Sequence, residues 1–232
     1  MDGRNKPGHD GGGRIGMRIL SSLAFAVILA IIGFVGWVYS LGPLPLDEAR
    51  RVSTTVVDRN GKLLRAYAMA DGRWRLPVDA KANVDPTYLK LLFAYEDQRF
   101  YAHDGIDPLA LGRAAVQVAT RGHIVSGGST ISMQLARLIE PRRQRSLYAK
   151  LHQIVRAIEL ERTLSKDEIL NLYLALAPYG GNLEGVRAAS LAYFGKEPKR
   201  LSVAEAALLV ALPQSPEARR PDRDRVAAIK AR

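Results

Sequence analysis

The most apolar part of the chain lies near its N-terminus. Residues 1–18 are basic and rich in glycine, and the run from Ile19 to Leu44 then carries no charge. About 20 apolar residues cross the hydrocarbon core of a bilayer, and Trp37 and Tyr39 stand where an interfacial aromatic belt is expected. The pattern predicts a transmembrane anchor over residues 19–41 and a cytoplasmic tail over residues 1–18, because basic flanks stay inside. The alternative is a cleaved signal peptide, whose apolar region is usually about 7–15 residues long.

Residues 42–80 have the pattern of a linker followed by a small β segment. Thr54–Val57 and Leu63–Tyr67 flank Asn60-Gly61, a pair that favours a tight two-residue hairpin turn. The stretch DGRWRLPV at residues 71–78 is a candidate for a further strand.

From residue 81 onward the pattern becomes helical, with apolar residues recurring at intervals of three and four. Asp85-Pro86 and Asp107-Pro108 each supply an N-cap acceptor followed by proline at the first helical position. Capping boxes begin at Ser165 and Ser202. The sequence therefore predicts a mainly α protein with a small β-hairpin region and one N-terminal transmembrane helix, its functional domain covering residues 81–232.

Composition narrows the possible partners and chemistry. The 232 residues carry a formal net charge of +11, which suits a nucleic acid, an acidic membrane surface or a phosphate-bearing substrate. The sequence has no cysteine, so disulfides, thiolate metal sites and a cysteine nucleophile are excluded. The predicted anchor places the basic domain outside the cytoplasm, which argues against a nucleic acid as partner.

The first candidate for chemistry is EDQRFYAHDG, residues 96–105. Glu96 and Asp97 fall near the C-terminal end of a predicted helix, where a carboxylate is unfavourable against the helix dipole. Beside aromatic residues such as Phe100 and Tyr101, an acid with a raised pKa could act as a general acid or base. The alternative is a solvated turn that contains two acids.

Two further stretches suit an anionic ligand. In SGGSTISMQLAR, residues 126–137, the glycines allow close backbone approach, and Ser129 or Thr130 would cap a helix whose N-terminus can bind an anion. The alternative is a flexible loop with an ordinary cap. The basic run from Arg137 to Arg156 could hold a diphosphate, because guanidinium groups match pairs of phosphate oxygens. Its alternative is a solvated face or a membrane-surface patch.

A fourth stretch, residues 166–196, resembles two core helices joined by a turn at Gly180-Gly181.

Taken in order, these stretches resemble glycosyltransferase family 51, the peptidoglycan glycosyltransferase domain of class A penicillin-binding proteins. The family motif E-D-x-x-F-x-x-H-x-G corresponds to residues 96–105, and G-G-S-T-[IL]-x-Q-Q-L to residues 127–135, with Met133 for the first glutamine. K-x-x-I-L-x-x-Y-L corresponds to residues 166–174, and an ending like R-A-A-x-x-Y-F-G-K to residues 187–196. The resemblance covers about residues 50–220. DGRWRLPV, APYGGNLEG and LPQSPEARRPDR are closest to the penicillin-binding protein 1C branch.

The resemblance implies a lysozyme-like helical fold beside the membrane and the polymerisation of lipid II into glycan strands. Undecaprenyl diphosphate would be released with inversion at the sugar carbon, and Glu96 would be the general base. The candidate substrate-binding residues are Asp97, Phe100, His103, Ser129, Thr130, Gln134, Arg137, Lys150, Gln153 and Arg187. No dedicated metal-ligand cluster is visible, although family members often respond to Mg²⁺ or Mn²⁺. The expected partners are lipid II, the growing strand, the inner membrane and proteins of cell-wall synthesis or division, with the catalytic domain in the periplasm.

The chain also departs from the family pattern. The motif R-K-x-x-E reads Ala149-Lys150-Leu151-His152-Gln153, so an amide replaces the second carboxylate and cannot serve as a base or an ionised metal ligand. Asn171 and Ala175 replace the usual Glu and Asn of the next motif, and Arg137 stands for a common Lys. No S-x-x-K or K-T-G set occurs, so we expect no transpeptidase domain in these residues.

Two other functions fit part of this sequence. An inactive scaffold that binds lipid II or a division partner is suggested by the substitutions at residues 149 and 153 and by the missing transpeptidase motifs. A lysozyme-like lytic enzyme would also use one glutamate, but it needs neither a diphosphate site nor a membrane anchor.

Overall fold

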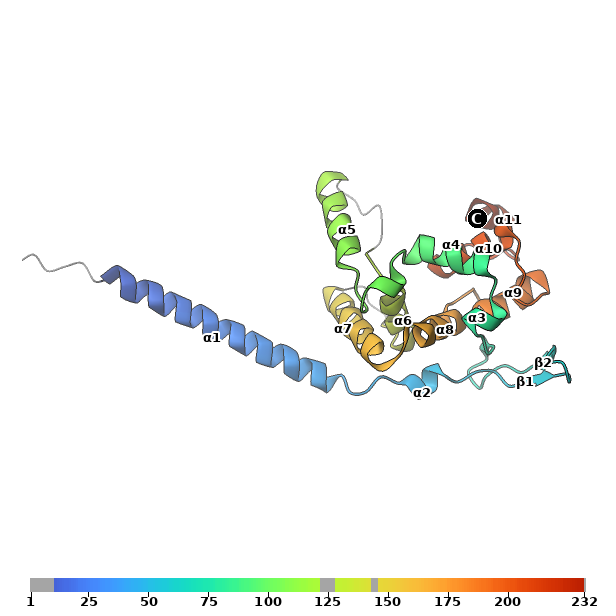
Figure 1. Ribbon diagram of the computed structural model, residues 1–232, viewed down its shortest axis with the longest axis horizontal. Helices are drawn as coiled ribbons and strands as arrows, with labels where there is room; N and C mark the ends of the chain where they lie inside the picture. Colours follow the sequence, from blue (N-terminus) through green and yellow to red (C-terminus); the bar gives the residue numbers. More distant parts are fainter. Residues whose placement is uncertain (1–10, 122–127, 143–145, 232) are drawn as a thin grey trace, which may run out of the picture. The chain divides into compact units, whose positions relative to one another are not determined.

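The computed structural model describes residues 11–121, 128–142 and 146–231 (Figure 1). The chain divides into two compact units, Met1–Pro43 and Leu44–Arg232. The first unit contains helix α1 (Gly11–Ser40). The second contains, in chain order, α2 (Leu46–Ala49), β1 (Thr55–Val57), β2 (Leu63–Ala66), β3 (Trp74–Arg75), α3 (Ala80–Asn83), α4 (Pro86–Glu96), η1 (Phe100–Ala102), α5 (Pro108–Arg121), α6 (Ile131–Ile139), α7 (Leu147–Thr163), α8 (Lys166–Leu176), β4 (Leu183–Glu184), α9 (Val186–Phe194), α10 (Val203–Ala211), η2 (Leu212–Gln214) and α11 (Arg225–Ala231). The prediction of a mainly α protein with a small β region is confirmed.

Helix α1 contains the predicted apolar span. Its segment Ser22–Ser40 has a mean hydropathy of 2.3. By length and composition this segment can cross a membrane. The helix begins at Gly11, before the predicted start at residue 19.

The β segment forms the predicted hairpin, but its turn is wider than expected. β1 and β2 pair antiparallel, with a bulge between Val56 and Val57. Asp58 accepts hydrogen bonds from the N–H groups of Asn60 and Lys62, at 2.8 and 2.9 Å, and Gly61 adopts a φ of 78°. The aspartate side chain thereby holds a longer loop, in which the glycine supplies the left-handed position.

For the second small sheet, the sequence predicted only one of the two strands. β3 falls within the DGRWRLPV stretch and pairs in parallel with β4, a strand that the sequence did not predict. The pairing joins the predicted linker region to the helical part of the chain. The domain boundary placed at residue 80 stays a prediction.

Buried Arg75 fixes this junction. Its Nε donates to a carboxylate oxygen of Glu184 at 2.8 Å, and its NH1 donates to the backbone carbonyls of Glu48 and Arg51 at 3.2 and 3.1 Å. Arg75 is 6% exposed and Glu184 is also buried. Removal of the Arg75 side chain would therefore leave the Glu184 carboxylate buried without its buried ion-pair partner.

The helices begin where the sequence predicted. Asp85 caps α4 by accepting from the N–H of Thr87 at 2.8 Å, and Asp107 accepts from the N–H of Ala110 at 2.9 Å near the start of α5. Both predicted capping boxes are present, at Ser165 and Ser202.

The core positions two helix ends for the site. α6 packs against both α7 and α8, while α4 packs against α10 (Figure 1). The fully buried side chains include Tyr88 and Leu92 of α4, Ile131 and Leu135 of α6, and Tyr173 of α8. The C-terminal end of α4 and the N-terminal end of α6 are therefore both held by packed helices.

We predict that Arg75→Leu lowers the free energy of unfolding by about 3–5 kcal/mol, because it breaks a buried ion pair from one side. Thermal or denaturant unfolding of the detergent-solubilised chain measures the change. Arg73→Leu is the matched control, since Arg73 also pairs with Glu184 but its side chain is 53% exposed. The control should change stability by less than about 1 kcal/mol. Equal losses in the two variants would contradict this account.

Candidate active site

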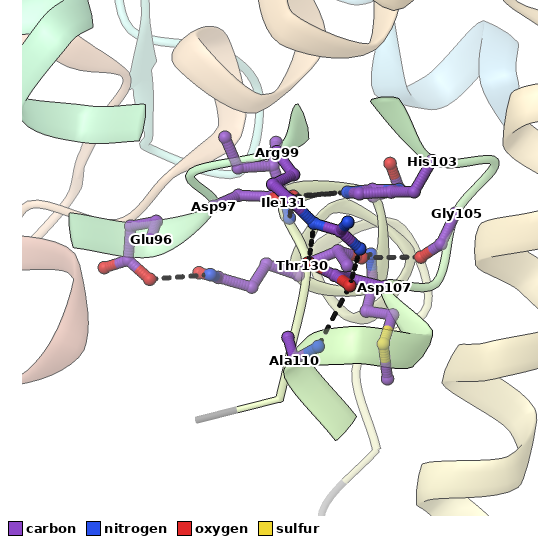
Figure 2. Close-up of polar contacts among 12 residues, drawn as sticks. Glu96, Asp97, Arg99, His103, Gly105, Asp107, Ala110, Thr130 and Ile131 are labelled. Atoms are coloured by element: carbon purple, nitrogen blue, oxygen red, sulfur yellow. Dashed lines mark hydrogen bonds and ion pairs between the residues drawn. The ribbon is translucent and has the colours of Figure 1, made fainter. Parts of the chain in front are cut away.

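Glu96 is the last residue of α4, and neutral donors hold both of its carboxylate oxygens. Gln134 Nε2 donates to Glu96 Oε2 at 2.8 Å, and Gln214 Nε2 donates to Glu96 Oε1 at 3.1 Å. The Glu96 side chain is half-buried. Figure 2 shows it at the end of its helix, with Asp97 beside it. No ion pair to Glu96 occurs within the described part of the chain, so the carboxylate is oriented without being neutralised by a cation.

Two tyrosine hydroxyl groups donate hydrogen bonds to the oxygens of these two amides. Tyr173 donates to Gln134 Oε1 at 3.4 Å, and Tyr95 donates to Gln214 Oε1 at 3.0 Å. Each tyrosine leaves the amide nitrogen turned toward Glu96.

Asp97 points away from Glu96, into the protein. Its two carboxylate oxygens each lie 3.0 Å from His103 Nε2, and Oδ2 also accepts from the backbone N–H of Ile131 at 2.9 Å (Figure 2). Asp97 and His103 are 6% and 7% exposed. Because a carboxylate only accepts, His103 Nε2 is the donor in this contact, and buried Nδ1 has no hydrogen-bond partner among the residues that the structure describes.

Thr130 makes a second connection between the same segments. Its hydroxyl donates to the carbonyl of Gly105 at 2.6 Å and accepts from the N–H of Met133 at 3.1 Å (Figure 2). Gly105 has a φ of 92°, and a Cβ there would lie 2.8 Å from the backbone of Ala157. The N–H groups of Ile131 and Met133 are used internally, so the start of α6 offers a substrate anion fewer free donors than the sequence suggested.

Arg99 and Asp107 form a bidentate ion pair (Figure 2). Arg99 Nε donates to Asp107 Oδ2 at 3.0 Å. The hydrogen bond from Arg99 holds the pKa of Asp107 down to about 2, and the N–H of Ala110 adds to the effect. Asp107 is therefore a fixed anion that caps α5.

Cationic residues lie on the α6 and α7 side of Glu96. Lys150 Nζ donates to Ser129 Oγ at 2.6 Å, and burial together with nearby Arg137 lowers the pKa of Lys150. Arg137, in the last turn of α6, is exposed. A bound anion would favour the charged form of Lys150.

Two cavities meet at Glu96. One, of about 440 Å³, is lined by Glu96, Ser129 and Gln214 together with Arg99 and Arg113. The other, of about 210 Å³, is lined by the same three residues together with Gln134, Arg137 and Gln153. A carboxylate shared by two polar cavities can contact groups bound in either.

The described residues contain no group of three or more His, Asp or Glu side chains placed to hold a metal ion. The carboxylates of Asp97 and Asp107, two residues that line the larger cavity, are bound to His103 and Arg99. Hard divalent cations prefer several free oxygen ligands, so the donor set does not fit a dedicated Mg²⁺ or Mn²⁺ site.

The predicted site residues separate into three groups. Those at the cavities are Glu96, Asp97, Ser129, Thr130, Gln134, Arg137 and Gln153, with Lys150 bound to Ser129. Phe100 and His103 are buried behind them, and the ring of Phe100 lies 4.6 Å from Lys166 Nζ. Arg187 lies apart, because its guanidinium donates to Glu197 and to the carbonyl of Pro77.

Sequence reasoning missed Gln214 and its contact with Glu96, from which it is 118 residues distant. Its stretch, LPQSPEARRPDR, was noted for its resemblance to one branch of the family, which is the signal that could have drawn attention to it.

A family model described as transglycosylase matches residues 60–232. The chain is 47% identical over 204 residues to penicillin-binding protein 1C of Escherichia coli, covering 88% of this chain and 26% of that protein. It is 37% identical over 198 residues to penicillin-binding protein 1F of Bacillus subtilis, covering 84% and 27%, and 36% identical over 210 residues to penicillin-binding protein 1A of Pseudomonas aeruginosa, covering 86% and 25%. The chain thus spans about a quarter of the length of these relatives. Since the family model covers well over half of its residues, the chain belongs to the transglycosylase family.

Proposed function

We propose that the chain is a peptidoglycan glycosyltransferase of cell-wall synthesis, which polymerises lipid II and releases undecaprenyl diphosphate. The observation that carries the proposal is the Glu96 carboxylate, held by two neutral amides where two cavities meet. Membership of the transglycosylase family and similarity to penicillin-binding proteins support the reaction class.

In the proposed reaction Glu96 is the general base. It takes the proton from the 4-hydroxyl of the acceptor sugar, and the hydroxyl oxygen forms a bond to the anomeric carbon of the donor. The bond from that carbon to the diphosphate oxygen breaks on the opposite face, so the configuration inverts. The amides of Gln134 and Gln214 aim the carboxylate, and general-base catalysis of this kind contributes about 10²–10⁴-fold in rate.

The leaving diphosphate requires cations rather than a proton donor. Arg137 and Lys150 stand on the α6 and α7 side of the site, with Ser129 held by Lys150. Guanidinium and ammonium groups can stabilise the charge that develops on phosphate oxygens as the bond breaks. This cation pair favours transfer from a lipid diphosphate over a lytic reaction, which releases no diphosphate.

We assign supporting roles to Asp97, His103 and Thr130, and place Arg187 outside the reaction. The first three join the segment after α4 to the start of α6, and their burial supports a role in shaping the site from within. Arg187 is engaged by Glu197 and Pro77.

The proposed location is the inner membrane. The apolar segment Ser22–Ser40 would be a single-pass anchor with the N-terminus in the cytoplasm, because the residues before it are basic. The catalytic domain would then lie in the periplasm, where lipid II and the growing strand are its partners. Contacts with other proteins of cell-wall synthesis or division stay a prediction.

We predict that Glu96→Gln lowers the rate of polymerisation by about 10²–10⁴-fold, because the amide keeps the shape of the side chain but cannot accept the proton. Polymer formation from labelled lipid II by the detergent-solubilised chain is the measurement. Lipid II binding should persist in the variant. If wild type and variant both bind lipid II and neither makes polymer, the chain is a scaffold, and Ala149 and Gln153 become the first residues to restore to the family pattern.

We also predict that Lys150→Gln lowers kcat by about 10²-fold, which is the usual loss when one preorganised donor to a developing negative charge is removed. Lys90→Gln is the matched control, since Lys90 is an exposed residue of α4 that lines neither cavity. The same polymerisation assay compares the two variants. Similar activities for both would remove Lys150 from the diphosphate site.

A further inference from the structure

The Glu96 carboxylate is held from two directions, and the two donors have different origins. Gln134 lies on α6, within the G-G-S-T motif, and approaches Oε2. Gln214 ends η2, directly after α10, and approaches Oε1. None of the motifs considered for the catalytic chemistry contains Gln214, yet it contacts the same carboxylate.

The polarity of the Gln214 amide is set by its neighbours. An ionised carboxylate only accepts hydrogen bonds, so the group that faces Glu96 Oε1 must be the NH₂ of the amide. The amide oxygen then faces Tyr95, whose hydroxyl donates to it at 3.0 Å. Tyr95 and Glu96 are adjacent in α4, so Gln214 bridges two consecutive side chains at the end of that helix.

The backbone that carries Gln214 is well anchored. Leu212, at the start of η2, is fully buried, and the N–H of Ser215 donates to its carbonyl at 3.0 Å. Arg219 donates to the carbonyl of Ala211 at 2.7 Å, at the end of α10. Because α10 packs against α4, Gln214 and Glu96 are brought together by elements that are fixed relative to each other.

Gln214 also lies where the two cavities meet. Both cavities are lined by Glu96 and Gln214, and both side chains are accessible from them. In the free protein water competes for the amide and the carboxylate. A substrate that fills the cavities removes that water, and a hydrogen bond to a charged group is stronger in the drier surroundings.

We propose that Gln214, oriented by Tyr95, is a positioning residue that holds the Glu96 carboxylate at the junction of the two cavities, ready to accept the proton of the acceptor hydroxyl. The inference rests on the proposed function, in which Glu96 is the base. Gln214 acts through Glu96, and its effect belongs to the chemical step rather than to substrate affinity.

The kinetic test compares Gln214→Leu, Tyr95→Phe and the double variant in lipid II polymerisation. Gln214→Leu should lower kcat by about 10- to 100-fold with little change in KM, the range expected for losing a hydrogen bond to a charged group. Tyr95→Phe should give a smaller loss, and the double variant should be no slower than Gln214→Leu, because the two residues act in series. The acidic limb of the pH–rate profile should move to higher pH in Gln214→Leu, because the ionised carboxylate has lost a donor.

Tyr101→Phe is the matched control for Tyr95→Phe. Both tyrosines are exposed, at 59% and 56%, and Tyr101 lies outside both cavities. It should leave kcat, KM and the pH profile unchanged.

A second measurement does not depend on turnover. Carboxyl ¹³C NMR of the glutamate-labelled, detergent-solubilised chain follows Glu96 as the pH changes, and Glu96→Gln identifies its signal. The signal should titrate at higher pH in Gln214→Leu than in the wild type, and at the wild-type pH in Tyr101→Phe.

Three results would overturn the inference. These are a Gln214→Leu enzyme with kcat within twofold of the wild type, a rise in KM with kcat unchanged, and coincident titrations of Glu96 in wild type and variant. Failure of the proposed function looks different. In that case the wild type makes no polymer, while the NMR titration still decides whether Gln214 holds the carboxylate.

Discussion

The site depends on the buried carboxylate of Asp97, which joins the end of one helix to the start of another. A carboxylate at the C-terminal end of α4 faces the negative end of that helix dipole, and its burial alone would cost several kcal/mol. Both costs are offset by the His103 ring and by the N–H of Ile131, at the positive end of α6. The anion-binding property of the α6 N-terminus, which the sequence suggested for a substrate, is thus used in part by the protein's own aspartate. The arrangement fixes the distance between the Glu96 carboxylate on α4 and the residues on α6.

The same junction explains why two adjacent acids have different surroundings. α4 ends at Glu96, and Asp97 leaves the helix with an extended φ of −159°. The change in backbone direction sends one carboxylate toward the cavities and the other toward the core. Glu96 meets neutral amides, whereas Asp97 meets an imidazole and a backbone N–H. Polar contacts, most of them from segments distant in sequence, therefore separate a residue suited to proton transfer from one suited to holding the fold.

Local sequence signals predicted the features that local interactions determine. The helix caps at Asp85, Ser165 and Ser202 are each settled within a few residues, and so is the existence of the hairpin. The contacts of Gln214 with Glu96 and of Arg75 with Glu184 join residues more than a hundred positions apart. The spacing of apolar and polar residues along the chain cannot predict such contacts. Arg187 was predicted to contact the substrate because it lies in a family motif. In the structure its guanidinium donates to Glu197. Motif identity indicates which residues belong to the family, but the packing of the helices decides which of them reach the cavities.

The distribution of charge around Glu96 bears on the kind of reaction that the site can support. The sequence has Gln153 where the family pattern has a glutamate, so the cations Arg137 and Lys150 are not balanced by a carboxylate at that position. A carboxylate on one side and cations on the other suit the proposed reaction, in which a proton leaves the acceptor while negative charge collects on a departing diphosphate. Cleavage of a glycosidic bond instead requires an acid that protonates the leaving sugar oxygen. Both oxygens of Glu96 accept hydrogen bonds from amides, an arrangement that suits a proton acceptor better than a proton donor. Gln153, in place of the second carboxylate, therefore leaves intact the asymmetry of charge that the proposed transfer from a lipid diphosphate requires.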